Sequence, residues 1–211
     1  MNELLDSITK DELNLLPVET FAGHIVVVDT LEELDKVISI LNQQEVIGFD
    51  TETKPVFTKG KRNKVALLQI ATSTTCYLIR LNQIGFPVGL TDFFNNKHVL
   101  KVGLSIKDDF LMLRGRDHAL EPQGFIELQS FVKDYGIADN SLQKIYAILF
   151  GKKLSKAQRL SNWEADELSH GQQAYAALDA IACRQIYLEL KQKYPLKPLE
   201  TTPKPIQVEP E

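Results

Sequence analysis

The chain has 211 residues, of which 44% are hydrophobic and 25% are charged. This is the composition of a globular domain, and it excludes a wholly disordered, collagenous or coiled-coil chain. The length suits one domain with one large core, and the net charge of -4 gives no general signature of nucleic-acid binding.

The sequence shows no sign of a membrane segment or an export signal. No apolar run approaches the roughly 18 residues of a membrane helix, and the acidic start MNELLDSITKDEL does not match a signal peptide. We therefore expect a soluble, cytoplasmic protein with no membrane association. Cys76 and Cys183 are too few for a disulfide framework and are expected to be free thiols.

Three parts are predicted along the chain. Residues 1–22 are expected to be an N-terminal helical lead-in, and residues 23–194 are expected to form the main domain. The segment from Pro195 holds five of the nine prolines and few bulky apolar residues. Residues 195–211 are therefore predicted to be a Pro-rich, disordered tail.

The first half of the main domain is rich in predicted strands. A β-branched run at 25–28 predicts a strand, and Thr30 with Glu33 makes a capping box that opens an amphipathic helix. Three more strands are predicted in the segments VIGFDTET, VALLQIAT and CYLI.

Helices and strands alternate in the second half. HVLKVG and FIEL predict strands, and helices are predicted over about 105–114, over 141–150 and from a Ser169–Gln172 capping box to about Lys193. This order predicts an α/β fold in which a mixed β-sheet of antiparallel and parallel strands is flanked by helices on both faces.

Two carboxylates stand at the end of a predicted strand. Asp50 and Glu52 are two residues apart, so on a strand they point to the same face. Adjacent carboxylates repel each other unless one keeps a proton or a cation neutralises them, and hard divalent ions prefer such oxygen ligands. The pair is nevertheless a common pattern by chance, and a charged edge strand is the alternative.

A tyrosine and an aspartate share one face of the last predicted helix. Tyr175 and Asp179 are one turn apart, and the same face carries Ala176, Ala180 and Cys183. An acid on such an apolar stripe needs a partner or a metal. The alternative is a core tyrosine beside a structural aspartate.

Two short segments are basic in this acidic chain. TKGKRNK contains Arg62 and Lys64, and GKKLSKAQR contains Lys152, Lys153 and Arg159. Charged loops are usually only solvated surface. Because each segment flanks one of the acidic motifs, these five residues are predicted to contact phosphates of a substrate. Trp163 follows the second segment and is expected to pack in the core rather than stack on a base.

The acidic motifs occur in a recognisable order. Asp50-Thr-Glu52 comes first, the segment KVGLSIKDDFLML follows, and Tyr175-x-x-x-Asp179 comes last. From about Gly23 to Tyr187 the sequence resembles the DEDD superfamily of 3′-5′ exonucleases, in particular the tyrosine-bearing subgroup that contains ribonuclease D and the Werner syndrome helicase exonuclease domain. The resemblance implies a ribonuclease H-like exonuclease fold.

The resemblance also implies roles for single residues. Asp50, Glu52, Asp109, Tyr175 and Asp179 would be catalytic. Asp109 matches better than its neighbour Asp108, because in the family the aspartate follows the strand-ending Gly-x-x-Ile by three positions. The four acids would hold two Mg²⁺ or Mn²⁺ ions, and Tyr175 would orient the attacking water.

The segment IELQSF departs from the family pattern, because many relatives have an aspartate near the end of that strand. The departure changes support of the site and removes no metal ligand.

The expected function is metal-dependent 3′-5′ hydrolysis of phosphodiester bonds at the 3′ end of DNA or RNA. The expected partner is therefore a nucleic acid, as a single strand or a 3′ end, and the sequence does not identify a protein partner. The alternative is a catalytically silent nucleic-acid-binding module of the same fold. FDTET superficially resembles the DxDxT opening of haloacid-dehalogenase-type phosphatases, but Glu52 stands where those enzymes need aspartate. The absence of G-x-G-x-x-G after a strand excludes a Rossmann domain.

Overall fold

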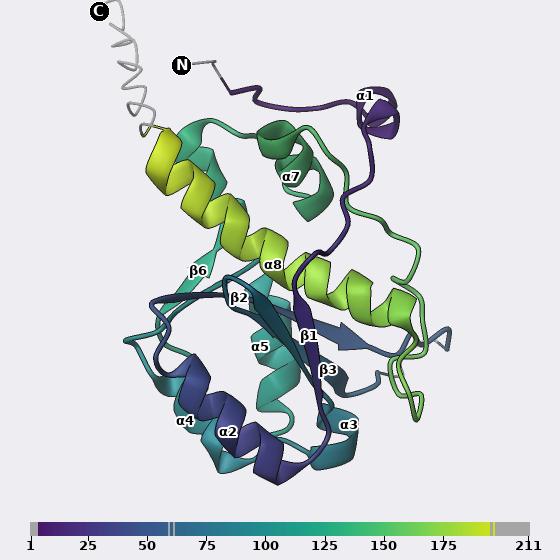
Figure 1. Ribbon diagram of the computed structural model, residues 1–211, viewed down its shortest axis with the longest axis vertical. Coiled ribbons are helices and arrows are strands. Elements are labelled where there is room, and N and C mark those ends of the chain that lie inside the picture. The colour runs from purple at the N-terminus through teal and green to yellow at the C-terminus, as the bar shows by residue number, and fades with distance from the viewer. Residues whose placement is uncertain (1–3, 59, 61, 195, 197–211) are drawn as a thin grey trace, which may run out of the picture.

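The computed structural model describes residues 4–58, 60, 62–194 and 196. The predicted tail, apart from Leu196, and the lysines at positions 59 and 61 lie outside the described residues. Figure 1 shows one sheet with a long helix across one face and shorter helices on the other.

The sheet has six strands in the order β1-β4-β3-β2-β5-β6. The strands are β1 (His24–Val28), β2 (Val46–Thr53), β3 (Val65–Ala71), β4 (Thr75–Ile79), β5 (Leu100–Gly103) and β6 (Phe125–Glu127). Strands β2, β3 and β4 pair antiparallel, whereas β1 pairs parallel with β4, and β5 pairs parallel with both β2 and β6. The mixed sheet predicted from the sequence is therefore confirmed.

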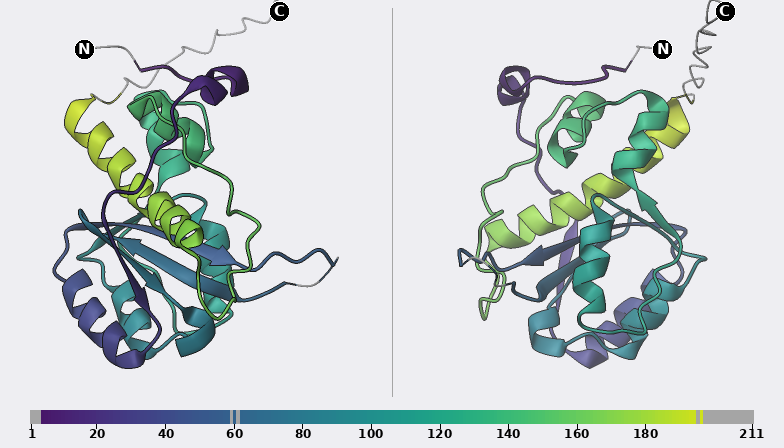
Figure 2. Two further views of the ribbon diagram at one scale, coloured as in Figure 1. Left: turned by 45° about the vertical axis from the view of Figure 1, so that its right-hand side comes forward. Right: turned by 180° about the vertical axis from the view of Figure 1, so that it is seen from behind.

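Most of the helices lie in a layer on one face or the other of the sheet. The helices are α1 (Lys10–Leu15), α2 (Leu31–Leu41), α3 (Leu81–Ile84), α4 (Val88–Asn95), α5 (Ile106–Arg114), α6 (Leu128–Phe131), α7 (Leu142–Phe150) and α8 (His170–Lys193), with a 3₁₀ turn at Val132–Tyr135. Residues of α7 and α8 share one core with the sheet, and residues of α2, α4 and α5 share a second core on the opposite face (Figure 2). None of the helices in the described part of the chain is long and apolar enough to cross a membrane.

Capping residues in the sequence correctly predicted where several of these helices begin or end. The Thr30 side chain accepts a hydrogen bond from the Glu33 backbone and starts α2, and Ser169 and Gln172 form a capping box at the start of α8. Gly151 ends α7 in the left-handed conformation, at φ 64°. Helices α3 and α4 were not predicted, because their four and eight residues give only short periodic patterns in the sequence.

The N-terminal segment is mostly extended. Its only helix in the described range is α1, which Thr9 and Glu12 cap reciprocally. Beyond α1, Val18 pairs in parallel with Lys153, and the Glu19 backbone N–H donates to the Lys153 carbonyl at 2.9 Å. The segment thus runs along the connection between α7 and α8, and the predicted helical character is confined to six residues.

A close approach of α8 to β2 positions the site. A Cβ at Gly48 would lie 1.9 Å from the Ala180 carbonyl oxygen, so only glycine fits between this strand and the helix. Gly48 and Asp50 share a face of β2, and Ala180 directly follows Asp179. The absent side chain therefore brings the acid of the helix close to the acids of the strand.

Candidate active site

Three carboxylates converge where β2 passes under α8. One oxygen each from Asp50, Glu52 and Asp179 can be chosen so that all three lie within 4.8 Å of one another. Asp50 and Glu52 point to the same face because they alternate along β2. The structure thus brings the first and the third sequence motifs together, although they lie more than a hundred residues apart.

Asp109 reaches this cluster from the opposite layer. It lies in the first turn of α5, and its carboxylate accepts a hydrogen bond from the Thr51 hydroxyl. Thr51 stands between Asp50 and Glu52 and points to the other face of β2, so it links α5 to the strand. Asp108 is exposed, whereas Asp109 is half-buried. This geometry favours Asp109 over Asp108 as the acid of the second motif.

Burial and mutual repulsion raise the pKa values of the acids. Burial raises the pKa of Asp50 well above its usual range, and the charges of Asp179, Asp109 and Glu52 raise it further. Burial and the charges of Asp179 and Asp109 raise the pKa of Glu52 to about 8. Burial also raises the pKa values of Asp109 and Asp179. The cluster therefore cannot carry its full negative charge near neutral pH unless cations neutralise it.

The donor set fits a hard divalent cation. All the converging ligand atoms are carboxylate oxygens, which Mg²⁺ and Mn²⁺ prefer over the softer nitrogen and sulfur ligands. Carboxylates whose pKa is raised by their mutual repulsion are the groups that a cation stabilises most. The site is thus suited to divalent metal binding.

Tyr175 lies one turn before Asp179 on α8. Burial and the charges of Asp179 and Glu52 raise the pKa of its hydroxyl, so the hydroxyl keeps its proton at neutral pH. The ring centroid lies 6.0 Å from that of Trp163, which is fully buried. Trp163 therefore packs against the tyrosine, as expected, and is not available to stack on a base.

Glu127 is a supporting residue whose role the sequence analysis did not identify. Its carboxylate accepts hydrogen bonds from the backbone N–H groups of Ser105 and Ile106 at 3.0 and 2.9 Å. These are the first groups of α5, and Ser105 adopts a left-handed conformation at φ 63°. Glu127 thereby fixes the start of the helix that carries Asp109. It is the last residue of β6, in the segment IELQSF that departs from the family pattern.

The predicted phosphate contacts divide into two groups. Exposed Arg159 lies close enough to Glu52 to lower the pKa of that carboxyl, which burial and neighbouring acids otherwise raise. Arg62 and Lys64 line a polar cavity of about 570 Å³. In contrast, Lys152 pairs with Glu19 at 3.1 Å and Lys153 donates to the Asn14 carbonyl at 2.5 Å. These two lysines bind the N-terminal segment.

The positive charge of Lys156 also affects the acidic cluster, although this lysine was not predicted as a substrate contact. Burial raises the pKa of Asp179, and both the Tyr175 hydroxyl and the Lys156 charge oppose that rise. Lys156 is exposed in the same basic segment as Arg159. Among the described residues, Arg159 and Lys156 thus lower the pKa values of these acids, and both belong to the second half of that segment.

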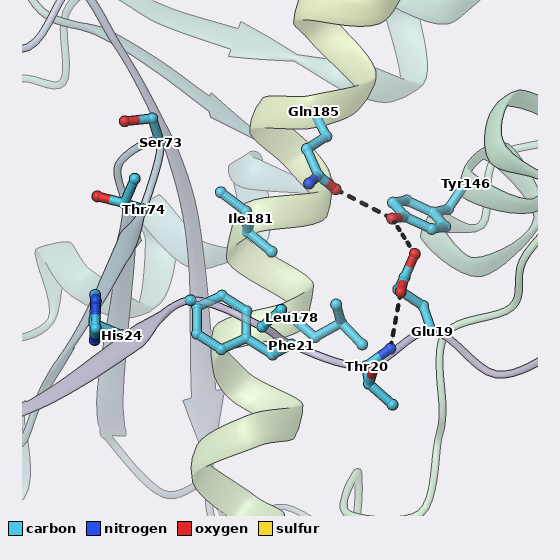
Figure 3. A pocket seen from close by; sticks show the side chains of 12 residues that line it. Glu19, Thr20, Phe21, His24, Ser73, Thr74, Tyr146, Leu178, Ile181 and Gln185 are labelled. Carbon is cyan, nitrogen blue, oxygen red and sulfur yellow. Dashed lines mark hydrogen bonds between the residues drawn. The ribbon is translucent and has the colours of Figure 1, made fainter.

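A separate cavity of about 440 Å³ lies along the middle of α8 (Figure 3). Its lining includes Phe21, Leu178 and Ile181, and the Tyr146 hydroxyl donates to Glu19 at 3.0 Å at its edge. None of the acidic-motif residues lines this cavity. It belongs to the contact between the N-terminal segment and α8.

Comparison with known proteins identifies the family. The sequence profile of the 3′-5′ exonuclease domain matches residues 25–195. The bifunctional 3′-5′ exonuclease/ATP-dependent helicase WRN of Mus musculus is 36% identical over 186 residues, which cover 83% of this chain and 13% of that protein. The chain therefore belongs to the 3′-5′ exonuclease domain family, within the DEDD superfamily.

Solved structures show the same fold. The Nibbler EXO domain of Aedes aegypti superposes with a TM-score of 0.74 at 26% sequence identity. The superposition covers 82% of this chain and 91% of the Nibbler chain. RNase D of Escherichia coli superposes with a TM-score of 0.70 at 20% sequence identity, and the superposition covers 80% of this chain and 45% of the RNase D chain. At this level of identity the similarity concerns the fold alone. The ribonuclease H-like exonuclease fold is thus confirmed.

Proposed function

We propose that this chain removes nucleotides from the 3′ end of DNA or RNA by metal-dependent hydrolysis of phosphodiester bonds. The observation that carries the proposal is the convergence of Asp50, Glu52 and Asp179, with Asp109 and Tyr175 beside them, in a domain of the 3′-5′ exonuclease family. Because the chain covers only 13% of its mouse relative, the helicase activity in that protein's name is not transferred.

The acids would hold two Mg²⁺ or Mn²⁺ ions, with Asp50, Glu52, Asp109 and Asp179 as ligands. When bound, such ions lower the pKa of a water molecule and stabilise charge on the leaving 3′ oxygen. Thr51 and Glu127 hold Asp109 in place through β2 and the start of α5. A ligand held in this way keeps its geometry when substrate binds.

Tyr175 would orient the attacking water, as in the tyrosine-bearing subgroup. Its raised pKa makes it a hydrogen-bond donor and a poor base at pH 7. Arg159, Arg62 and Lys64 would contact phosphates and offset the repulsion between the acids and a polyanion. Lys152 and Lys153 were also predicted to contact phosphates. In this structure Lys152 pairs with Glu19 and Lys153 donates to the Asn14 carbonyl, so their contact with a substrate stays a prediction.

The test is an end-labelled cleavage assay. Matched 5′-labelled DNA and RNA strands are incubated with the protein and Mg²⁺, with 3′-blocked strands and Asp50→Ala protein as controls. A ladder that shortens from the 3′ end, and that is absent with both controls and in excess chelator, is expected. Binding without shortening would overturn the proposal in favour of a silent binding module, and the two sugars would rank the substrates.

A further inference from the structure

The cavity that contains Arg62 and Lys64 has a composition suited to phosphate. It measures about 570 Å³ and is lined by Arg62, Asn63, Lys64, Asn82, Arg116 and Glu164. Within the part of the chain that the structure describes, Glu164 is the one acid of this lining, and Lys54 pairs with it at 3.4 Å. Three cationic side chains and two amides therefore face one site in a chain whose net charge is -4.

Arg116 is an ordered member of this lining. Its guanidinium donates to the Val65 carbonyl, and its Nε is buried without a partner among the described residues. A guanidinium offers five N–H donors in a rigid fork, which matches the oxygens of a phosphate. Arg116 was not predicted as a phosphate contact, because it follows α5 and lies far along the chain from the two basic segments.

The cavity wall is also held in place on the Glu164 side. Arg80 is almost completely buried, at 2% exposed, and its guanidinium donates to the carbonyls of Ala165 and Asp166. These carbonyls directly follow Glu164 in the chain. The cavity thus combines an anchored arginine, Arg116, with the exposed side chains of Arg62 and Lys64, and Arg80 anchors the segment that follows Glu164.

The register of the sheet places this cavity beside the acids. Leu67 of β3 pairs with Glu52, and Val65 pairs with Thr53. Lys64 precedes Leu67 by three residues, which is about 10 Å along an extended chain at about 3.3 Å per residue. At about 3.4 Å of rise per nucleotide in a stacked strand, this distance corresponds to about three nucleotides.

We propose that this cavity, the upstream phosphate cavity, binds a backbone phosphate of the substrate strand about two to three nucleotides on the 5′ side of the bond that is cut. The inference rests on the proposed function and deepens it, because it assigns a strand length to the substrate. The protein then holds strands of four or more nucleotides more tightly than dinucleotides. A free nucleoside monophosphate also carries a phosphate that could bind in this cavity. The experiment must therefore distinguish a backbone phosphate of a strand from the phosphate of a free nucleotide.

The experiment measures binding in Ca²⁺, which blocks chemistry, to labelled strands of two and of eight nucleotides. Lys64→Ala removes an exposed charge and is not expected to disturb the fold. It should weaken binding of the longer strand about 5- to 10-fold, reduce the slope of log affinity against log salt by about one, and leave dinucleotide binding unchanged. Arg116→Lys keeps the positive charge but loses the planar guanidinium, so it should weaken binding of the longer strand and leave the salt dependence unchanged.

Lys97→Ala is the matched control, because Lys97 is exposed in the turn before β5, at the opposite end of the sheet. It should change neither strand's affinity. Equal weakening of both strands by Lys64→Ala, or none, would overturn the proposal. A nucleoside monophosphate whose own affinity falls as much in Lys64→Ala as that of the longer strand would assign the cavity to a free nucleotide and would also overturn the proposal. Because binding is measured without cleavage, a failure of nuclease activity is seen separately.

Discussion

The acidic cluster should make the metal-free protein less stable as the pH rises. The pKa of Glu52 is raised in the folded protein from 4.5 to about 8, mainly by burial. Between these two pH values the folded protein keeps a proton that the unfolded chain has released. The stabilisation is complete below about pH 4.5 and is lost as the pH rises through about 8. Asp50, Asp109 and Asp179 shift in the same direction, so they add to this effect.

The magnitude follows from the shift of Glu52. Each pKa unit corresponds to about 1.4 kcal/mol, so the rise from 4.5 to about 8 sets a ceiling of about 5 kcal/mol. Because the carboxyl is only half-buried, water relaxes around it and reduces this penalty. We expect the free energy of unfolding to fall by on the order of 2 to 4 kcal/mol between about pH 5 and pH 8.5, a large share of the stability of a typical domain.

The assay is urea unfolding followed by circular dichroism in excess chelator across this pH range. In Glu52→Gln the free energy of unfolding should depend less on pH. This variant should be more stable than the wild type at the highest pH. Exposed Glu121→Gln, placed outside the cluster, should follow the wild type. Mg²⁺ or Mn²⁺ at about 100 times its dissociation constant should restore about 2.7 kcal/mol to the wild type. A wild-type stability that stays level or rises with pH in chelator would refute this reasoning.

The remaining predictions concern single contacts of the site. Tyr175→Phe should reduce the single-turnover cleavage rate about 30- to 1000-fold, since one positioned hydrogen bond is lost, while strand affinity in Ca²⁺ stays at the wild-type value. Thr51→Val keeps the side-chain shape but removes the donor to Asp109; activity or metal affinity should fall about 10- to 100-fold in a Mn²⁺ titration, and unchanged values would make the contact incidental. Glu127→Gln weakens two charge-assisted bonds to α5, so urea unfolding should show a loss of about 1 to 3 kcal/mol.

The sequence predicted those parts of the structure that depend on neighbouring residues. The strand that carries Asp50 and Glu52 was expected in the segment VIGFDTET, which is where β2 lies. The start of α8 follows from the Ser169–Gln172 pair alone. Alternation along a strand and one turn of a helix are local rules, so they place carboxylates on faces without knowledge of the fold.

Long-range pairings could not be predicted in this way. Lys152 was expected to contact phosphate because its segment is basic, yet it pairs with Glu19, 133 residues away in the sequence. Arg116 was not selected, although it shares a cavity with Arg62 and Lys64. The partner of a charged side chain is set by the tertiary fold, so a run of charge identifies a polar surface but does not say what that surface binds.

Glu127 shows how a departure from a family pattern can keep a physical role. A glutamate at the end of β6 places its carboxylate on the backbone N–H groups of Ser105 and Ile106, where the partial positive charge of the start of α5 favours an anion. The same negative charge contributes to raising the pKa of Asp109, after the larger effect of burial. The residue that positions the helix therefore also increases the repulsion within the cluster. Because a bound cation removes that repulsion and leaves the two hydrogen bonds intact, the arrangement favours the metal-loaded state over the empty one.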